Sequence, residues 1–281
     1  MTVLLYHPLL VISILLMLCV QQESSAHPAI ELEIRQLNSA ISADQGNVTL
    51  LLRRAELFRL HGQLKEALAD LDVVEHRAPN TTSLAYHRAM LFRDMQRYEE
   101  ALSLIKGYIA VNLTSSEAYF QLSKIQRDMG HIDKSIESYR MAIYLLEKPS
   151  PDYFVELALI QKSTGDNEGA LKTINDGILK RGSIVSLQLV ALDIEEQAGL
   201  FGAALRRIDS LVNAGMQEES RLFRRARILL LSGRKKEAKE NCLQARADLM
   251  AQNRQRLATP ANQKLLAEIN ILLASGGLQD K

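Results

Sequence analysis

The sequence predicts an all-α protein, a solenoid of about six helical hairpins. Three observations lead to this prediction: a turn glycine that recurs about every 34 residues, small residues at fixed offsets from it, and apolar spacing of helical type. A period between about 20 and 50 residues is typical of stacked units that cover one another's apolar faces. The series comprises Gly62, Gly130, Gly165, Gly199 and Gly233, with Gln96 in the remaining position.

The columns around the glycine series predict how each hairpin packs. Small residues lie five positions after each turn residue: Ala67, Ala101, Ser135, Ala170, Ala204 and Ala238. Others lie seven positions before it: Ala55, Ala89, Ser123, Ala158 and Ala226, with Leu192 as the exception. Nine positions after it the residues are mostly apolar: Leu71, Ile105, Tyr139, Ile174, Ile208 and Cys242. Because two helices approach closely only where side chains are small, these columns predict tight contact within each pair.

The first unit shows the expected pattern in full. Leu51, Ala55 and Phe58 have helical spacing, and apolar residues with the same periodicity follow in 64–74. Gly62 lies between the two runs and can end the first helix in a left-handed conformation. Near 148–151 the series gains one residue, which we interpret as a longer corner within one array and not as a domain boundary.

This pattern resembles the tetratricopeptide repeat family, whose unit of 34 residues is a helix, a turn and a helix. The small, glycine and apolar columns correspond to the family's positions over roughly residues 48–248, and Pro79 fits its proline at the end of a unit. The early Trp of the family is missing, and the chain contains no Trp. The resemblance implies a right-handed superhelical solenoid of about six hairpins.

We expect four segments along the chain: a signal peptide at 1–26, an N-terminal cap helix at 27–46, six repeats at 47–247 and C-terminal cap helices at 248–281. The apolar run Leu9–Leu18 precedes small residues at Ser24–Ala26, which predicts cleavage after Ala26 and export to the periplasm or the exterior. No stable membrane span would then remain. Because no Lys or Arg precedes the run, an uncleaved membrane anchor is the alternative.

Apolar residues in the two cap segments have helical spacing. They are Ile30, Ile34, Leu37 and Ile41 before the array, and Leu265, Leu266, Ile269 and Leu272 after it. Terminal repeats need such a cover over their apolar faces.

Composition argues against a nucleic-acid partner. Hydrophobic residues make up 47% of the chain, charged residues 24%, and the net charge is +1. Charge is uneven, since 201–257 holds 13 basic residues against six acidic ones, a local net charge of +7. We favour a solvated helix face over a binding surface for an acidic partner in this segment.

No motif indicates catalysis, so we predict a protein that is not an enzyme and holds no cofactor or metal. The chain has no HExxH, no phosphate-binding glycine loop and no nucleophile elbow. Only Cys242 would remain after leader removal, which rules out an intramolecular disulfide. The alternative is a small metal-binding or enzymatic protein that uses the array as a frame, with His27 at its new amino terminus.

The resemblance implies that the first helices of the hairpins line a concave groove that binds a partner. One row of the groove is mostly apolar: Leu52, Tyr86, Phe120, Val155, Leu189 and Phe223. A second row is cationic: Arg59, Arg93, Arg127 and Lys162. These rows suit a protein or extended peptide of acidic character. The alternative is that the cations serve the helix C-termini or pair with Glu56, Asp94 and Asp128.

Three Asn-x-Thr sequons begin at Asn47, Asn80 and Asn112. All lie at unit junctions, where Asn and Thr also serve as turn and cap residues. We favour the capping role over glycosylation. The function predicted from the sequence is a non-catalytic scaffold or adaptor in an exported or envelope assembly.

Overall fold

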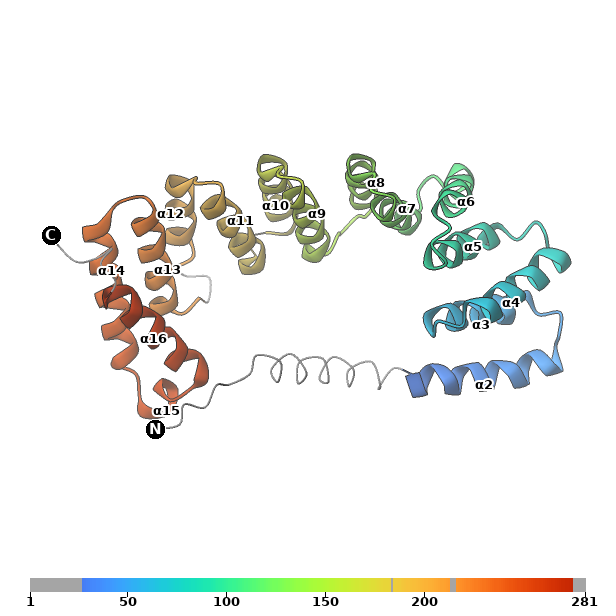
Figure 1. Ribbon diagram of the computed structural model, residues 1–281, viewed down its shortest axis with the longest axis horizontal. Helices are drawn as coiled ribbons and strands as arrows, with labels where there is room; N and C mark the ends of the chain where they lie inside the picture. Colours follow the sequence, from blue (N-terminus) through green and yellow to red (C-terminus); the bar gives the residue numbers. More distant parts are fainter. Residues whose placement is uncertain (1–26, 183, 213–215, 275–281) are drawn as a thin grey trace, which may run out of the picture. The chain divides into compact units, whose positions relative to one another are not determined.

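The computed structural model describes residues 27–182, 184–212 and 216–274, and the regular structure in these ranges is helical throughout (Figure 1). The expected leader at 1–26 lies outside the described residues. The helices are α2 (His27–Ala43), α3 (Val48–Leu60), α4 (Leu64–Arg77), α5 (Thr82–Asp94), α6 (Tyr98–Val111), α7 (Ser116–Asp128), α8 (Ile132–Tyr144), α9 (Pro151–Ser163), α10 (Asn167–Arg181), α11 (Val185–Gln197), α12 (Phe201–Ser210), α13 (Glu218–Leu231), α14 (Lys235–Met250), α15 (Arg254–Leu257) and α16 (Pro260–Ala274). None of them is long and apolar enough to cross a membrane.

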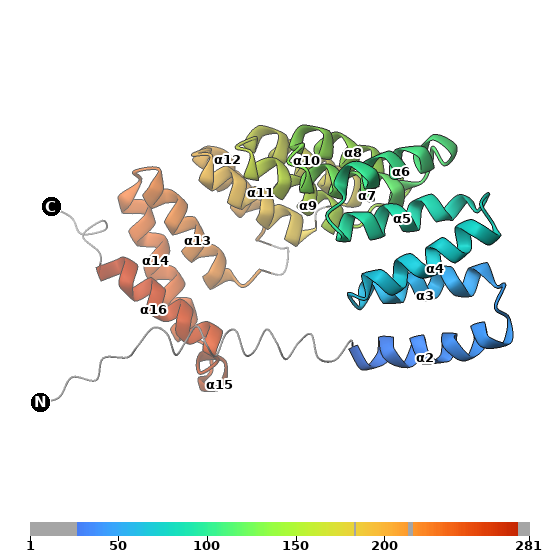
Figure 2. The same cartoon turned by 45° about the vertical axis from the view of Figure 1, so that its right-hand side comes forward.

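Consecutive helices from α3 to α14 pair into six hairpins, as the glycine series predicts. Within a hairpin the two helices lie side by side, and the second helix packs on the first helix of the following hairpin, as α4 does on α5 and α6 on α7 (Figure 2). The predicted all-α solenoid of hairpins is thereby confirmed.

The chain divides into two compact units between Leu146 and Glu147. Unit 1 contains α2 to α8, and unit 2 contains α9 to α16. The division falls at the longer corner, which the sequence pattern alone led us to interpret as part of one continuous array. Pro151 begins α9, where its missing N–H costs no helical hydrogen bond.

Each first helix ends in the same hydrogen-bonded turn. In the first hairpin the Gln63 N–H donates to Phe58 O at 2.8 Å and the Gly62 N–H donates to Arg59 O at 3.0 Å, which is the Schellman pattern. The same two bonds recur at the other five turns. All five glycines have φ between 72° and 83°. Gln96 adopts the same left-handed conformation with φ 60°, so the hairpin without a glycine keeps its turn.

The predicted small and apolar columns form the buried interior. The small residues five positions after the turn are all 0% exposed: Ala67, Ala101, Ser135, Ala170, Ala204 and Ala238. Where Ser replaces Ala, the hydroxyls of Ser123 and Ser135 lie 2.9 Å apart and satisfy each other. The apolar column, which includes Tyr139 and Cys242, is at most 1% exposed.

In three hairpins the two helices are also joined by a buried pair of polar side chains that lie twelve residues apart in the sequence. Ser138 Oγ donates to Gln126 Oε1 at 2.7 Å in the third hairpin, and Thr173 Oγ1 donates to Gln161 Oε1 at 2.7 Å in the fourth. In the fifth, Arg207 pairs with Glu195 through two bonds of 2.8 and 2.9 Å. Each pair satisfies groups that would be costly to bury alone.

A cap helix lies at each end of the described chain. In unit 1, α2 packs on α3 through the buried Ile34 and Ile41. In unit 2, α16 packs on α14 and buries Ile269. Both helices lie in the segments that the sequence predicted as caps.

Candidate partner-binding site

In unit 1 the predicted apolar row is largely occupied by contacts within the protein. Leu52 is half-buried on α3. Tyr86 on α5 packs against Tyr108 with ring centroids 5.4 Å apart, and its hydroxyl donates to Glu117 Oε1 at 3.3 Å. Burial and the nearby Glu117 carboxylate raise the pKa of Tyr86. Phe120 is only 5% exposed and packs edge-on against Tyr139 at 4.9 Å, so it contributes to the core and offers no groove surface.

Arg59 and Arg93, the first two of the predicted groove cations, are paired with carboxylates. Arg59 binds Glu56 at 2.8 Å on its own helix and also Asp94 in the next hairpin. Arg93 donates from Nε to Asp128 Oδ2 at 2.7 Å, again in the next hairpin. The alternative that these cations pair with neighbouring carboxylates therefore describes Arg59 and Arg93. Both arginines tie adjacent hairpins together, and an acidic partner would have to displace those carboxylates.

The pKa of Glu56 is lowered more strongly than that of any other described carboxylate in this region. It lies 3.8 Å from His87 Nδ1 and accepts two hydrogen bonds from Arg59 at 2.8 and 3.1 Å. His87 and then Arg59 lower the pKa of Glu56 to about 2, against an opposing effect of burial. Glu56 is therefore charged over the whole physiological range.

Arg127, the third cation of the row, is half-buried at the end of α7 in unit 1 and also interacts within the protein. Lys162, half-buried near the end of α9 in unit 2, makes no hydrogen bond or ion pair with the residues that the structure describes.

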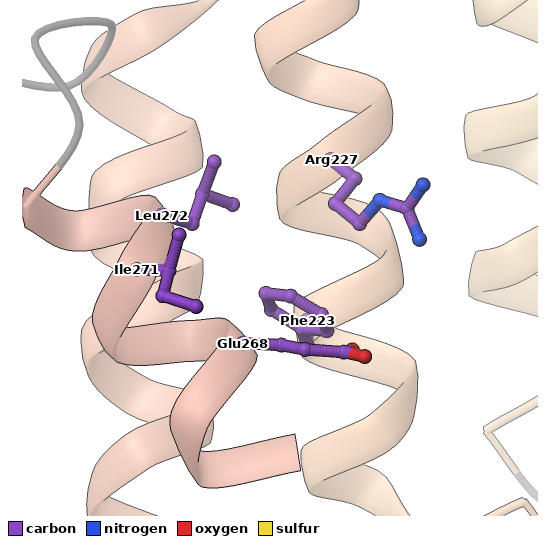
Figure 3. Close-up of a pocket in the computed structure, with 5 residues that line it drawn as sticks. All are labelled: Phe223, Arg227, Glu268, Ile271 and Leu272. Carbon is purple, nitrogen blue, oxygen red and sulfur yellow. The ribbon is translucent and has the colours of Figure 1, made fainter. Parts of the chain in front are cut away.

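In unit 2 the predicted groove residue Phe223 lines an open pocket of about 360 Å³ between α13 and α16. Phe223 and Arg227 come from α13, and Glu268, Ile271 and Leu272 come from α16 (Figure 3). We call this hollow the Phe223 pocket. Phe223 is 7% exposed, whereas Ile271 is 70% exposed at the rim. The volume lies near the lower end of the ~300–1,000 Å³ found for ligand pockets.

Two opposite charges flank this apolar surface. Arg227 and Glu268 make no hydrogen bond or ion pair with the described part of the chain, and they do not approach each other within 4.0 Å. Arg224, three residues before Arg227 on α13, is engaged instead with Glu196 at 2.8 Å and with Asp193. Arg227 therefore remains available to a partner where Arg224 does not.

A relay of buried polar groups fixes the corner that leads into α16. Gln252 donates from Nε2 to Glu219 Oε1 at 2.6 Å, and Asn262 donates from Nδ2 to Gln252 Oε1 at 2.9 Å. The same amide donates to Arg256 O at 2.9 Å. Glu219 and Asn262 are 6% and 7% exposed. Because the relay joins α13 to the start of α16, the two walls of the Phe223 pocket are held in place.

Sequence reasoning identified Phe223 but missed the rest of this pocket. Arg227 lies one helical turn after Phe223, in the repeat column that also contains Glu56, and that spacing was available as a signal. Glu268 and Ile271 belong to the cap helix, whose placement against α13 no repeat column encodes.

Several arginines of the basic segment 201–257 pair with carboxylates of unit 2. Its ion pairs include Arg207–Glu195, Arg221–Glu218, Arg224–Glu196, Arg225–Asp209 and Arg234–Glu237. Cys242 is buried, and burial raises the pKa of its thiol to about 11. In the described ranges no group of three His, Cys, Asp or Glu side chains could hold a metal ion.

The three sequon asparagines lie in different surroundings. Asn47 caps α3 by accepting from the Leu50 N–H at 3.2 Å, and Asn112 donates to Tyr108 O at 2.9 Å at the end of α6. Asn80 is exposed in the turn before α5. A capping role is therefore present at two of the three positions.

The chain is similar to tetratricopeptide repeat proteins. Residues 116–147, which span α7 and α8, match the tetratricopeptide repeat family model. No curated protein matches the chain in sequence.

Several solved structures are similar to the chain. The C-terminal part of a TPR repeat-containing protein from Cytophaga hutchinsonii has a TM-score of 0.60 at 13% identity, over 83% of this chain and 95% of that one. A structure of Naa15/Naa10 bound to HypK-THB has a TM-score of 0.56 at 17% identity, over 81% of this chain and 34% of that one. MamA has a TM-score of 0.46 at 20% identity, over 56% of this chain and 92% of that one.

Proposed function

We propose that the protein is a non-catalytic scaffold that binds a segment of another protein on the face formed by the first helices of its hairpins. The observation that carries this proposal is the Phe223 pocket, where an apolar first-helix residue lies at the floor of an open hollow with unpaired charges beside it. A site of this kind suits recognition of a side chain, since apolar contact supplies affinity and the charges supply orientation.

The fold supports a protein partner over a small substrate. Tetratricopeptide repeat stacks present extended surfaces to protein segments, and one of the similar structures is a complex of three named proteins. In unit 1 the proposed contact surface reduces to the region of Leu52 and Tyr86, because Arg59 and Arg93 are tied to neighbouring carboxylates. In unit 2 it includes Lys162 and Phe223.

We further propose that the scaffold acts outside the cytoplasm, in a periplasmic or envelope assembly. The support is the sequence of the leader, with its apolar run Leu9–Leu18 followed by Ser24–Ala26. Amino-terminal sequencing of the chain from its native source should give His27 as the first residue. An intact Met1 would show that the leader is retained as an anchor.

Site-specific photo-crosslinking in the native source tests the scaffold itself. A photoreactive side chain replaces Leu52 in unit 1 or Ile271 in unit 2, with Leu179 as the control. Leu179 is 83% exposed but lies on a second helix, α10. We expect a discrete protein adduct at the first two positions and none at Leu179. Equal labelling at all three positions, or none at any, would contradict binding on the first-helix face.

A further inference from the structure

The Phe223 pocket lies where the cap helix α16 follows the last hairpin of unit 2. α16 packs on α14 as α5 packs on α4. Some first helices also pack directly on one another, as α9 does on α11, whereas α11 with α13 and α13 with α16 pack less closely. The space left between α13 and α16 is the pocket, and the Glu219–Gln252–Asn262 relay holds it open at the corner.

The pocket surface has three chemically distinct parts. Its floor and one wall are apolar, formed by Phe223 with Ile271 and Leu272. A guanidinium without a partner in the described chain, that of Arg227, projects from α13, and an equally unpaired carboxylate, that of Glu268, reaches from α16 toward Phe223 one helical turn away from Arg227 (Figure 3). A ligand that complements all three parts needs an apolar group between a negative and a positive one.

We infer that the Phe223 pocket binds a protein segment in which one large apolar side chain is flanked by an acidic residue that faces Arg227 and a basic residue that faces Glu268. This inference rests on the proposed function, since it names the chemistry of the partner at that site. The apolar side chain would cover Ile271, which is 70% exposed, and the two flanking charges would fix the direction of the segment across the pocket. The small volume of about 360 Å³ limits the anchor to one side chain.

Charge complementarity makes the direction of the segment testable. The guanidinium prefers a carboxylate, with which it forms two parallel hydrogen bonds, and it repels a cation. Glu268 has the opposite preference. A segment with its flanking charges exchanged would place like charges together at both rims and would bind more weakly.

The experiment selects binders from a displayed library of random short peptides, using the full-length chain as bait. We expect the enriched peptides to share one large apolar residue between an acidic and a basic residue. A synthetic peptide of the enriched sequence is then titrated by fluorescence anisotropy against variants of the full chain. Ile271→Asp should weaken binding about tenfold or more, because it places a charge in the apolar wall.

A charge exchange provides the decisive comparison. The double variant Arg227→Glu/Glu268→Arg should lose affinity for the enriched peptide about tenfold and regain it for the peptide with the two flanking charges exchanged. The matched control is Lys236→Glu/Glu240→Arg, an exchange of two exposed charges on α14 that leaves the net charge unchanged. This control should bind the original peptide as the wild type does.

The possible outcomes separate the inference from the proposed function. Peptides that bind the wild type and Ile271→Asp equally would overturn the pocket assignment and leave the scaffold function standing. If Ile271→Asp weakened peptide binding but the double charge variant did not prefer the charge-exchanged peptide, the assignment of the two flanking charges would be overturned. Failure to enrich any peptide would count against both proposals. Self-association of the wild type that Ile271→Asp abolishes would identify the occupant as a second copy and overturn the inference.

Discussion

Arg93 reaches from the end of α5 to Asp128 at the end of α7, 35 residues further along the chain, with Nε 2.7 Å from Oδ2. Arg59 and Asp94 have the same relationship one hairpin earlier. Both pairs join the C-terminal ends of consecutive first helices within unit 1. Their role is therefore to fix the spacing of neighbouring hairpins, and this role accounts for part of the cationic row that a partner was expected to use.

A double-mutant cycle measures that role. Arg93→Ala and Asp128→Ala are each expected to lower the free energy of unfolding, with a coupling of about 0.5–1 kcal/mol, because the pair is only partly exposed, with side chains 24% and 26% accessible. Urea unfolding of the two single variants and the double variant gives the coupling. The coupling should shrink at high salt, and a value indistinguishable from zero would show that the pair does not join the hairpins.

Replacement of Gln96 by Gly should stabilise unit 1. The residue has φ 60° and is exposed, so a glycine relieves a left-handed conformation without removing a buried contact. We expect a gain of about 0.5–1 kcal/mol in the free energy of unfolding, since the greater freedom of glycine in the unfolded chain offsets part of the relief.

The matched control reverses the change at an equivalent turn. Gly130 has φ 79°, and a Cβ there would meet no atom within 4 Å, so Gly130→Ala reports backbone conformation alone. It should cost about 1 kcal/mol. If Gln96→Gly were neutral while Gly130→Ala was costly, some contact of Gln96 would have to compensate for its conformation.

The low pKa of Glu56 predicts how its contribution to stability depends on pH. Its folded pKa of about 2 lies below the unfolded value of about 4.3, so the folded state gains stability that is fully present above the unfolded pKa and disappears as the pH falls through about 2. The stability difference between the wild type and Glu56→Gln should be up to about 3 kcal/mol at pH 7 and should shrink steadily from pH 5 to pH 2.

Urea unfolding at several pH values checks this prediction. Glu99→Gln serves as a control for the loss of one surface charge, because Glu99 is exposed on α6 and makes no contact with His87 or Arg59 among the described hydrogen bonds and ion pairs. A difference between the wild type and Glu56→Gln that stays constant down to pH 2 would contradict the assigned ion pairing.

The Arg207–Glu195 pair should be the most sensitive polar contact of unit 2. Glu195 is 3% exposed, and Arg207 also donates to Gln188 Oε1 at 2.5 Å. Arg207→Met leaves a buried carboxylate without its cation and should cost about 3–5 kcal/mol, whereas the double variant with Glu195→Leu should recover most of that loss. Arg206→Met, an exposed neighbour, should change the unfolding free energy by less than about 0.5 kcal/mol.

The turn-glycine series was enough to predict the hairpins, because one local geometry recurs at every turn. The same repetition misled the interpretation of individual columns. Phe120 shares a column with Phe223, yet Phe120 is buried against Tyr139 while Phe223 lines a pocket. The difference arises from which helix covers each residue, and a repeat column does not contain that information. The walls contributed by α16 could not be predicted for the same reason.

The buried polar pairs within the third, fourth and fifth hairpins limit how freely these repeats can be exchanged. Gln126, Gln161 and Glu195 occupy the same position of successive first helices, but each has a different partner: Ser138, Thr173 and Arg207. A chimera that joined one helix of the fifth hairpin to the complementary helix of the third or fourth would set glutamine opposite arginine or glutamate opposite a hydroxyl, and so leave a buried charge without its counterpart. The third and fourth hairpins share an amide–hydroxyl pair and could exchange helices at this position. Duplication or shuffling of the fifth hairpin within the gene would be tolerated only when both of its helices move together.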